Sequence, residues 1–299
     1  MISFLKLIRY KNLLMVLLTM VLTKYALIDS FVEKSYLSDY QFSIFIISIL
    51  FITAGGYIIN DIVDIEADKI NKPNKVFIDK TFTKKSAKKG YLFLTFCGII
   101  SGCSLSFIVN KPIYSLIYFL TVIGLYLYSS YLKKTSLIGN LIVSTFIGIS
   151  IITLFIFELI NFNKGFETLV LSFYIGTYVI FSFLTTLIRE IIKDIEDING
   201  DLKINAKTLP IVFGRKRANR VAFSISIILT ILLIFISKSF LIEFPLFLSY
   251  SIVFVLLPLL FFMYKLWNAE SKKEYSKLSQ LMKLIMFFGI LSMLFFKFI

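Results

Sequence analysis

Long apolar runs, separated by short polar segments, constrain this chain more than any other feature. Nine such runs can be read along its 299 residues, and each has about the 20 residues that an α-helix needs to cross a bilayer. In lipid the backbone N–H and C=O groups must be paired within their own segment, which a helix achieves. We therefore predict an all-α fold, a bundle of nine transmembrane helices in a single domain that covers residues 1–299. The expected spans are 12–32, 41–60, 90–109, 112–132, 137–158, 167–192, 221–240, 244–264 and 280–298.

The composition agrees with a membrane protein and excludes some chemistry. Hydrophobic residues make up 58% of the chain and charged residues only 17%, with a mean hydropathy of +0.87. The chain contains no histidine, which excludes histidine metal sites and histidine general bases. Cys97 and Cys103 lie in one apolar run, and we expect them to be reduced packing residues. Residues 1–11 lead into the first span without a small-residue cleavage site, so we expect no cleaved signal peptide.

The basic residues are divided unevenly between the two sides of the predicted bundle. If the N-terminus is inside, 26 of the 32 Lys and Arg residues fall in the cytoplasmic segments and six in the outer ones. The positive-inside rule then predicts an integral protein of the cytoplasmic (inner) membrane, with the N-terminus in the cytoplasm and the C-terminus outside. Because topology and contact with membrane lipid explain the formal charge of +14, we expect no nucleic-acid partner.

Two acidic segments stand where apolar runs end, and both fall on the predicted cytoplasmic side. Each holds three aspartates at spacings of three and four residues, and the segments start 133 residues apart. The aspartates are Asp61, Asp64 and Asp68 in the first segment and Asp194, Asp197 and Asp201 in the second. At these spacings the carboxylates lie on one face of an α-helix.

The repetition of this pattern favours a metal site over simple solvation. A single Asp-x-x-Asp at the end of a span is usually only solvated. Two copies offer six oxygen ligands of the kind that Mg²⁺ takes, and Mg²⁺ keeps part of its shell for phosphate oxygens. Since the acidic segments end a bundle of apolar helices and are rich in nearby lysines, we predict an Mg²⁺-dependent site for a prenyl diphosphate, with its isoprenoid tail between the helices.

These segments and the nine-span layout resemble the UbiA superfamily of intramembrane prenyltransferases. The first family motif, Asn-Asp-x-x-Asp-x-x-x-Asp, is matched from Asn60 to Asp68, and the second, Asp-x-x-x-Asp, at Asp197 and Asp201 with Asp194 added upstream. The resemblance implies prenyl transfer with loss of diphosphate. It implies that the six aspartates hold Mg²⁺, that Asp64 and Asp197 are central to catalysis, and that Asn60 orients the diphosphate.

The resemblance also assigns roles to several basic residues. Family members carry a Tyr and a Lys in the link after the fourth span, which Tyr128 and Lys133 match here with one extra residue between them. Lys133 is the candidate catalytic contact to the leaving diphosphate, and Tyr128 is a candidate binding residue. Lys72, Lys193 and Lys203 are further candidates for binding the diphosphate because they flank the two acidic segments.

The sequence leaves the acceptor open between a lipid-like and an aromatic molecule. Many members that use aromatic acceptors have an Arg-Thr…Arg-Pro segment after the first motif, where this chain has Asn71-Lys72-Pro73. This segment looks more like the branch that prenylates geranylgeranylglyceryl phosphate, so the preferred reaction transfers a geranylgeranyl group to a prenylated glycerol phosphate. Prenylation of an aromatic acceptor, as in quinone or haem side-chain synthesis, is the first alternative. An ion-coupled transporter is the second, although its sites usually lie near the membrane midplane. We expect Glu158, near an outer span end, to be snorkelled or solvated.

Overall fold

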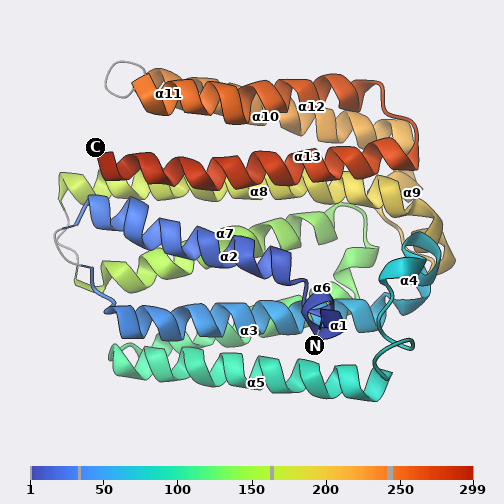
Figure 1. Cartoon of the computed structure of the whole chain (residues 1–299), viewed down its shortest axis with the longest axis horizontal. Coiled ribbons are helices and arrows are strands. Elements are labelled where there is room, and N and C mark those ends of the chain that lie inside the picture. Colours follow the sequence, from blue (N-terminus) through green and yellow to red (C-terminus); the bar gives the residue numbers. More distant parts are fainter. Residues whose placement is uncertain (1, 33–34, 162–164, 241–244, 299) are drawn as a thin grey trace.

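The computed structural model describes residues 2–32, 35–161, 165–240 and 245–298, and these form an elongated bundle of helices (Figure 1). Nine helical stretches within the described residues are long and apolar enough to cross a membrane, as the sequence predicts, and the protein is integral to a membrane. The spans are α2 (Tyr10–Leu22) with η1 (Thr23–Leu27) and η2 (Ile28–Ser30), α3 (Asp39–Val63), α5 (Lys84–Ile108), α6 (Ser115–Ser130), α7 (Ile138–Glu158), α8 (Phe166–Lys203), α10 (Arg215–Phe240), α11 (Pro245–Ser251) with η7 (Ile252–Leu256) and α12 (Leu257–Trp267), and α13 (Lys272–Leu291) with η8 (Ser292–Phe298). The shorter elements are α1 (Ile2–Leu7), α4 (Ile65–Asn71), α9 (Leu209–Phe213), η3 (Pro73–Lys75), η4 (Pro112–Tyr114), η5 (Leu132–Lys134) and η6 (Leu159–Asn161).

Local sequence signals explain where several of these helices begin. The Ser38 hydroxyl accepts from the backbone N–H of Gln41, whose side chain bonds back to the Ser38 N–H, and Ser271 and Glu274 repeat this capping box at the start of α13. Thr83 caps α5 by accepting from the Ser86 N–H. Each cap satisfies backbone donors that a helix start leaves unpaired.

Helix α8 occupies the centre of the bundle. Its neighbours are α4, α7, α9, α10 and α13, and its buried face is largely Ile, Leu and Thr. The helix has 38 residues, which gives a length of about 57 Å at 1.5 Å per residue and exceeds the hydrocarbon thickness of a bilayer. The predicted span 167–192 is therefore only part of α8, and the helix carries the second acidic segment beyond the apolar run without a break.

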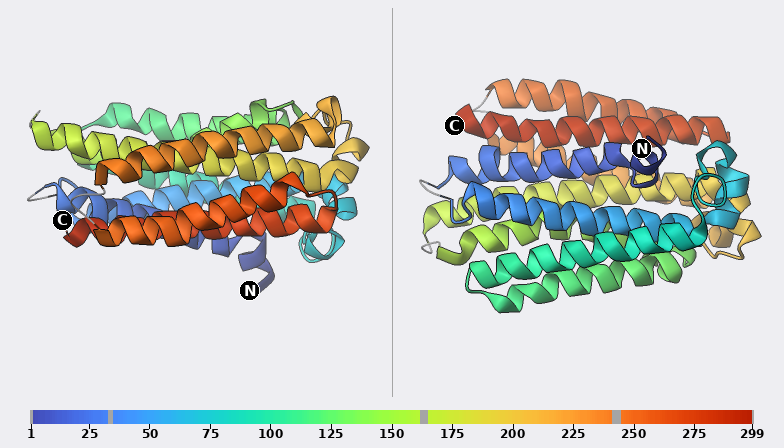
Figure 2. Two further views of the ribbon diagram at one scale, coloured as in Figure 1. Left: turned by 90° about the horizontal axis from the view of Figure 1, so that it is seen from above. Right: turned by 60° about the horizontal axis from the view of Figure 1, so that its bottom comes forward.

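The short helices gather at one end of the bundle, which we call the acidic end because both acidic segments lie there. Figures 1 and 2 place α4 and α9 at this end, beside the last turns of α8. The backbone breaks between α3 and α4 at Asp64, whose φ of −88° and ψ of 2° leave the helical region. The expectation that the first three aspartates share one continuous helix is therefore wrong, since Asp64 stands at a bend.

At the opposite end, a buried ion pair corrects the expectation for Glu158. Its Oε1 accepts from Lys24 Nζ at 2.6 Å, and both side chains are 1% exposed. Glu158 Oε2 also accepts from the backbone N–H groups of Tyr36 and Leu37, at 2.8 and 3.2 Å. Glu158 is thus fully paired inside the protein and is not solvated.

Candidate functional site

The first acidic segment lies at the bend between α3 and α4, and basic side chains bind two of its carboxylates. Asp61 Oδ1 accepts from Arg9 Nη2 at 2.6 Å. Asp64 Oδ1 accepts from Lys133 Nζ, which also donates to Asn60 Oδ1 at 3.1 Å. Lys133 comes from the link between α6 and α7, so three elements meet at this segment.

The second acidic segment occupies the last turns of α8. Asp194 Oδ2 accepts from Asn140 Nδ2 of α7 at 2.8 Å. Asp197 Oδ2 forms an ion pair with Lys72, which follows α4. The other carboxylate oxygen of Asp197, Oδ1, is buried and has no hydrogen-bond partner among the described residues.

The two acidic segments are held together by Asn71, the last residue of α4. Its side-chain amide donates to the backbone carbonyl of Asp197 at 2.7 Å and accepts from the Gly200 N–H at 2.9 Å. A Cβ on Gly200 would stand 2.3 Å from the Asn71 amide nitrogen and 2.5 Å from the Ala67 carbonyl oxygen, so only glycine permits this approach. The structure therefore brings together segments that lie more than 120 residues apart in sequence.

The electrostatics of the acidic end are those of crowded carboxylates. Burial raises the pKa of Asp68 to about 6, Lys72 opposes that rise, and the charges of Asp64 and Asp61 add to it. Asp201 is likewise close enough to Asp197 and Asp64 to be repelled by both, which links the two segments through space. Carboxylates that repel one another need cations nearby to remain ionised.

The donor set at the acidic end fits a hard divalent cation. All candidate ligands are carboxylate oxygens, and the unpaired buried oxygen of Asp197 is of the kind that a cation satisfies. In this conformation no three carboxylates of the described residues stand around a single point in a metal-binding arrangement. Lys133, Lys72 and Arg9 instead bind one carboxylate each.

The remaining predicted site residues lie in different surroundings. Tyr128 is half buried and lies within electrostatic range of Glu190, Asp194 and Asp64, whereas Tyr131 of the same link is 65% exposed. Tyr128 is therefore the tyrosine that faces the acidic end. Lys193 pairs with Glu190 Oε2 at 2.9 Å and does not contact an aspartate of either segment.

Lys203 lies at the end of α8 and is exposed to solvent. The carboxylate of Glu66 on α4 is close enough to feel its charge. Lys203 is thus at the rim of the acidic end, at the same junction of α4 and α8 as Asn71.

Sequence reasoning missed several residues that shape this site. Arg9 and Asn71 both contact the acidic segments. Arg9 lies outside every motif noted in the sequence, and the Asn71-Lys72-Pro73 segment was used only to compare acceptors. Asn140 and Glu190 offered a usable signal, because each is a polar or charged residue within an apolar run, where such residues usually have a function.

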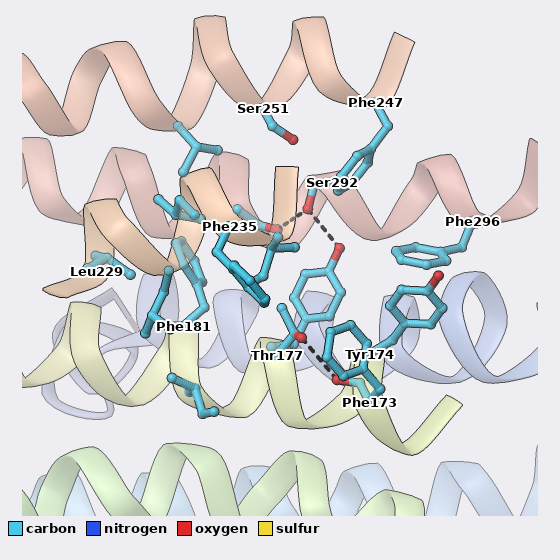
Figure 3. Close-up of a pocket in the computed structure, with 17 residues that line it drawn as sticks. Phe173, Tyr174, Thr177, Phe181, Leu229, Phe235, Phe247, Ser251, Ser292 and Phe296 are labelled. Carbon is cyan, nitrogen blue, oxygen red and sulfur yellow. Dashed lines mark hydrogen bonds between the residues drawn. The ribbon is translucent and has the colours of Figure 1, made fainter. Parts of the chain in front are cut away.

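An apolar pocket of about 200 Å³ lies in the half of the bundle away from the acidic end (Figure 3). It is lined by residues of α8, α10, α13, η8 and the α11–η7 segment, among them Phe181, Leu229 and Phe296. Inside it the hydroxyls of Tyr178 and Ser292 are 2.8 Å apart and bond to each other. Phe181 lies 13 residues before Asp194 on α8, a rise of about 20 Å along the helix axis.

The chain is similar to proteins of one family. A model of the UbiA prenyltransferase family matches residues 12–291. The digeranylgeranylglyceryl phosphate synthase of Saccharolobus solfataricus is 39% identical over 212 residues, which are 71% of this chain and 67% of that protein. A solved structure that describes the biosynthesis of digeranylgeranylglyceryl phosphate synthase in membranes is 28% identical, with a TM-score of 0.64, and the match covers 98% of this chain and 96% of that one. A UbiA homologue from Archaeoglobus fulgidus bound to GPP and Mg²⁺ has a TM-score of 0.60 over 97% of this chain and 99% of that one; at 15% identity that likeness is one of fold.

Proposed function

The chain belongs to the UbiA prenyltransferase family and is a membrane prenyltransferase, and from this premise we propose its substrates, its metal and its orientation. The donor is a polyprenyl diphosphate, of geranylgeranyl length, and the acceptor is a prenylated glycerol phosphate. The whole of residues 1–299 acts as one domain. The acidic end faces the cytoplasm, with the N-terminus on that side of the cytoplasmic membrane and the C-terminus on the other.

The observation that carries the proposal is the docking of the two acidic segments through Asn71 at the end of an apolar bundle. Six aspartates from both halves of the chain, Asp61, Asp64, Asp68, Asp194, Asp197 and Asp201, would hold Mg²⁺, which neutralises charge on a departing diphosphate. The relatives named above support the glycerol phosphate acceptor, and the neighbouring fold bound to GPP and Mg²⁺ supports the donor and the metal.

The protein's own side chains contribute the rest of the chemistry. The bond between the allylic carbon and the diphosphate oxygen breaks, and its electron pair leaves with the diphosphate. Lys133 and Lys72, freed from Asp64 and Asp197, donate to the phosphate oxygens as point charges. Asn60 and Tyr128 orient the head group, while Lys193 and Lys203 lie farther from the diphosphate. An acceptor hydroxyl oxygen then bonds to the allylic carbon, and its proton passes to the released diphosphate or to water.

The apolar interior supports a lipid-like donor. The pocket of Figure 3 begins about 20 Å along α8 from the second acidic segment, and its lining is apolar apart from a few hydroxyls. A diphosphate bound at the acidic end therefore has apolar space in the bundle toward which an isoprenoid tail can extend.

We expect Asp64→Asn and Asp197→Asn to lower turnover at least 100-fold, because each removes a charge that holds metal and metal-ion catalysis is worth several kcal/mol. Product formation from labelled geranylgeranyl diphosphate and geranylgeranylglyceryl phosphate measures the effect in purified protein. EDTA should abolish the same activity, and Mg²⁺ should restore it.

Asp79→Asn is the matched control. Asp79 is exposed, lies outside both acidic segments and has a φ of 70°, a conformation that Asn also tolerates. Activity of both active-site variants at the level of Asp79→Asn would refute the site. Turnover with an aromatic acceptor but not with the glycerol phosphate would refute the proposed acceptor alone.

A further inference from the structure

Four basic side chains lie together beside the acidic end, where α2, α8 and α13 approach one another. They are Arg9, Arg189, Lys193 and Lys283. Glu190 accepts from Arg189 Nη1 at 2.8 Å and from Lys193 Nζ at 2.9 Å, and Asp61 pairs with Arg9 at 2.6 Å. These two carboxylates pair with three of the four cations, and Lys283 forms no ion pair among the described residues. Clustered cations within a membrane bundle are costly unless a ligand balances their charge.

Lys283 is the outermost member of this cation cluster, and its position is unusual for a lysine. It lies 11 residues after the start of α13, about 16 Å along the helix axis, between apolar residues. Its side chain is exposed, and Nζ donates to Asn12 Oδ1 of α2 at 2.7 Å. It is also close enough to Arg189, Lys193 and Arg9 to be repelled by each. Lys283 therefore connects the surface seam between α2 and α13 (Figure 1) with the charges inside.

Two features of the arginines indicate that the cluster binds a ligand. Arg189 Nε is buried and has no hydrogen-bond partner among the described residues, so one donor of its guanidinium is left unpaired. Arg9 adopts a left-handed backbone, with φ 51°, and its guanidinium lies 5.1 Å from the centre of the Tyr57 ring. A left-handed conformation is unfavourable for an arginine, and such residues are concentrated at functional sites.

We propose that this cation cluster binds the phosphomonoester head group of a lipid-like acceptor, separately from the metal-held diphosphate of the donor. A phosphomonoester carries a charge of about −1.5 to −2 at neutral pH, which is opposite in sign to the charges of these four side chains. The fork of Arg189 suits phosphate oxygens, and the lysines add point charges. This inference rests on the proposed prenyl transfer and specifies the acceptor, since an acceptor without a phosphate has no need of these cations.

A binding experiment tests the site without depending on turnover. The protein is placed in phosphatidylcholine nanodiscs with EDTA, and binding of a lysophosphatidate, a single-chain glycerol phosphate, is compared with that of the matching monoacylglycerol. We expect at least tenfold tighter binding of the phosphorylated lipid, because charge-assisted hydrogen bonds are lost with the phosphate. Lys283→Gln and Arg189→Gln should remove this preference, and Lys277→Gln, which alters an exposed lysine of the same helix, should retain it.

Equal binding of the two lipids by the unaltered protein would overturn the proposal, and so would equal competition by phosphatidylglycerol or by inorganic phosphate. Steady-state kinetics supply the second readout. Lys283→Gln should raise the acceptor KM about tenfold or more and leave the donor KM unchanged. An increase in the donor KM instead would assign the cluster to the diphosphate. Selective lysophosphatidate binding without any prenyl transfer would support this site and refute the proposed function.

Discussion

The ion pair of Lys24 and Glu158 is the most deeply buried charged contact described above, and it lies far from the acidic end. Lys24 Nζ also donates to the Leu37 carbonyl at 2.9 Å and lies 5.3 Å from the centre of the Phe42 ring. Since both charges are fully paired, removal of one leaves the other buried without a partner, and that is worse than removal of both.

We predict that Lys24→Met destabilises the protein by about 3–5 kcal/mol, as is typical for a broken buried pair. The double variant Lys24→Met with Glu158→Leu should recover much of this loss, because no charge is left buried. Thermal unfolding in detergent measures both variants, and Lys111→Met, at an exposed lysine, is the control. A double variant no more stable than the single one would contradict this interpretation.

The junction of α4 with α8 is the element on which the candidate site depends most. α4 has only seven residues, too few for a helix to be stable alone, so its position comes from its contact with α8. Asn71 makes that contact at both ends of its amide, and the missing side chain of Gly200 makes room for it.

We predict that Gly200→Ala displaces α4 and lowers Mg²⁺-dependent binding of geranylgeranyl diphosphate at least tenfold, because a Cβ would stand 2.3 Å from the Asn71 amide nitrogen. Isothermal titration in nanodiscs measures the affinity. Gly176→Ala, on the same helix, is the control: a Cβ there meets no atom within 4 Å, and alanine favours the helix. Equal affinities of the two variants would show that the docking of α4 does not matter for the donor.

The whole molecule is polarised along its long axis. The acidic segments, α4 and α9 lie at one end, whereas the buried Lys24–Glu158 pair and the apolar pocket lie toward the other. The basic residues are concentrated at the acidic end, and from the positive-inside rule we propose that this end faces the cytoplasm.

The orientation predicts opposite accessibility for two exposed lysines at the two ends, Lys80 and Lys111. In a background without Cys97 and Cys103, a membrane-impermeant thiol reagent added to intact cells should label Lys111→Cys. It should label Lys80→Cys only after the membrane is opened. Labelling of both variants in intact cells, or the reverse pattern, would refute the proposed orientation.

The sequence determined the fold class, the number of spans and the two acidic segments, for local reasons. Apolar length decides whether a helix crosses a bilayer, and a spacing of three and four residues decides which side chains share a helix face. The same local argument failed at Asp64, where the backbone bends, and at α8, which continues to Lys203 past its apolar run.

Only the tertiary structure decided which residues meet. Asn71 and Gly200 are 129 residues apart, Lys24 and Glu158 are 134 apart, and Lys283 and Asn12 are 271 apart. No periodicity or spacing relates such pairs, because their contacts depend on how helices pack against one another. The sequence therefore identified the carboxylates and the membrane spans. Helix packing decided which side chains contact those carboxylates.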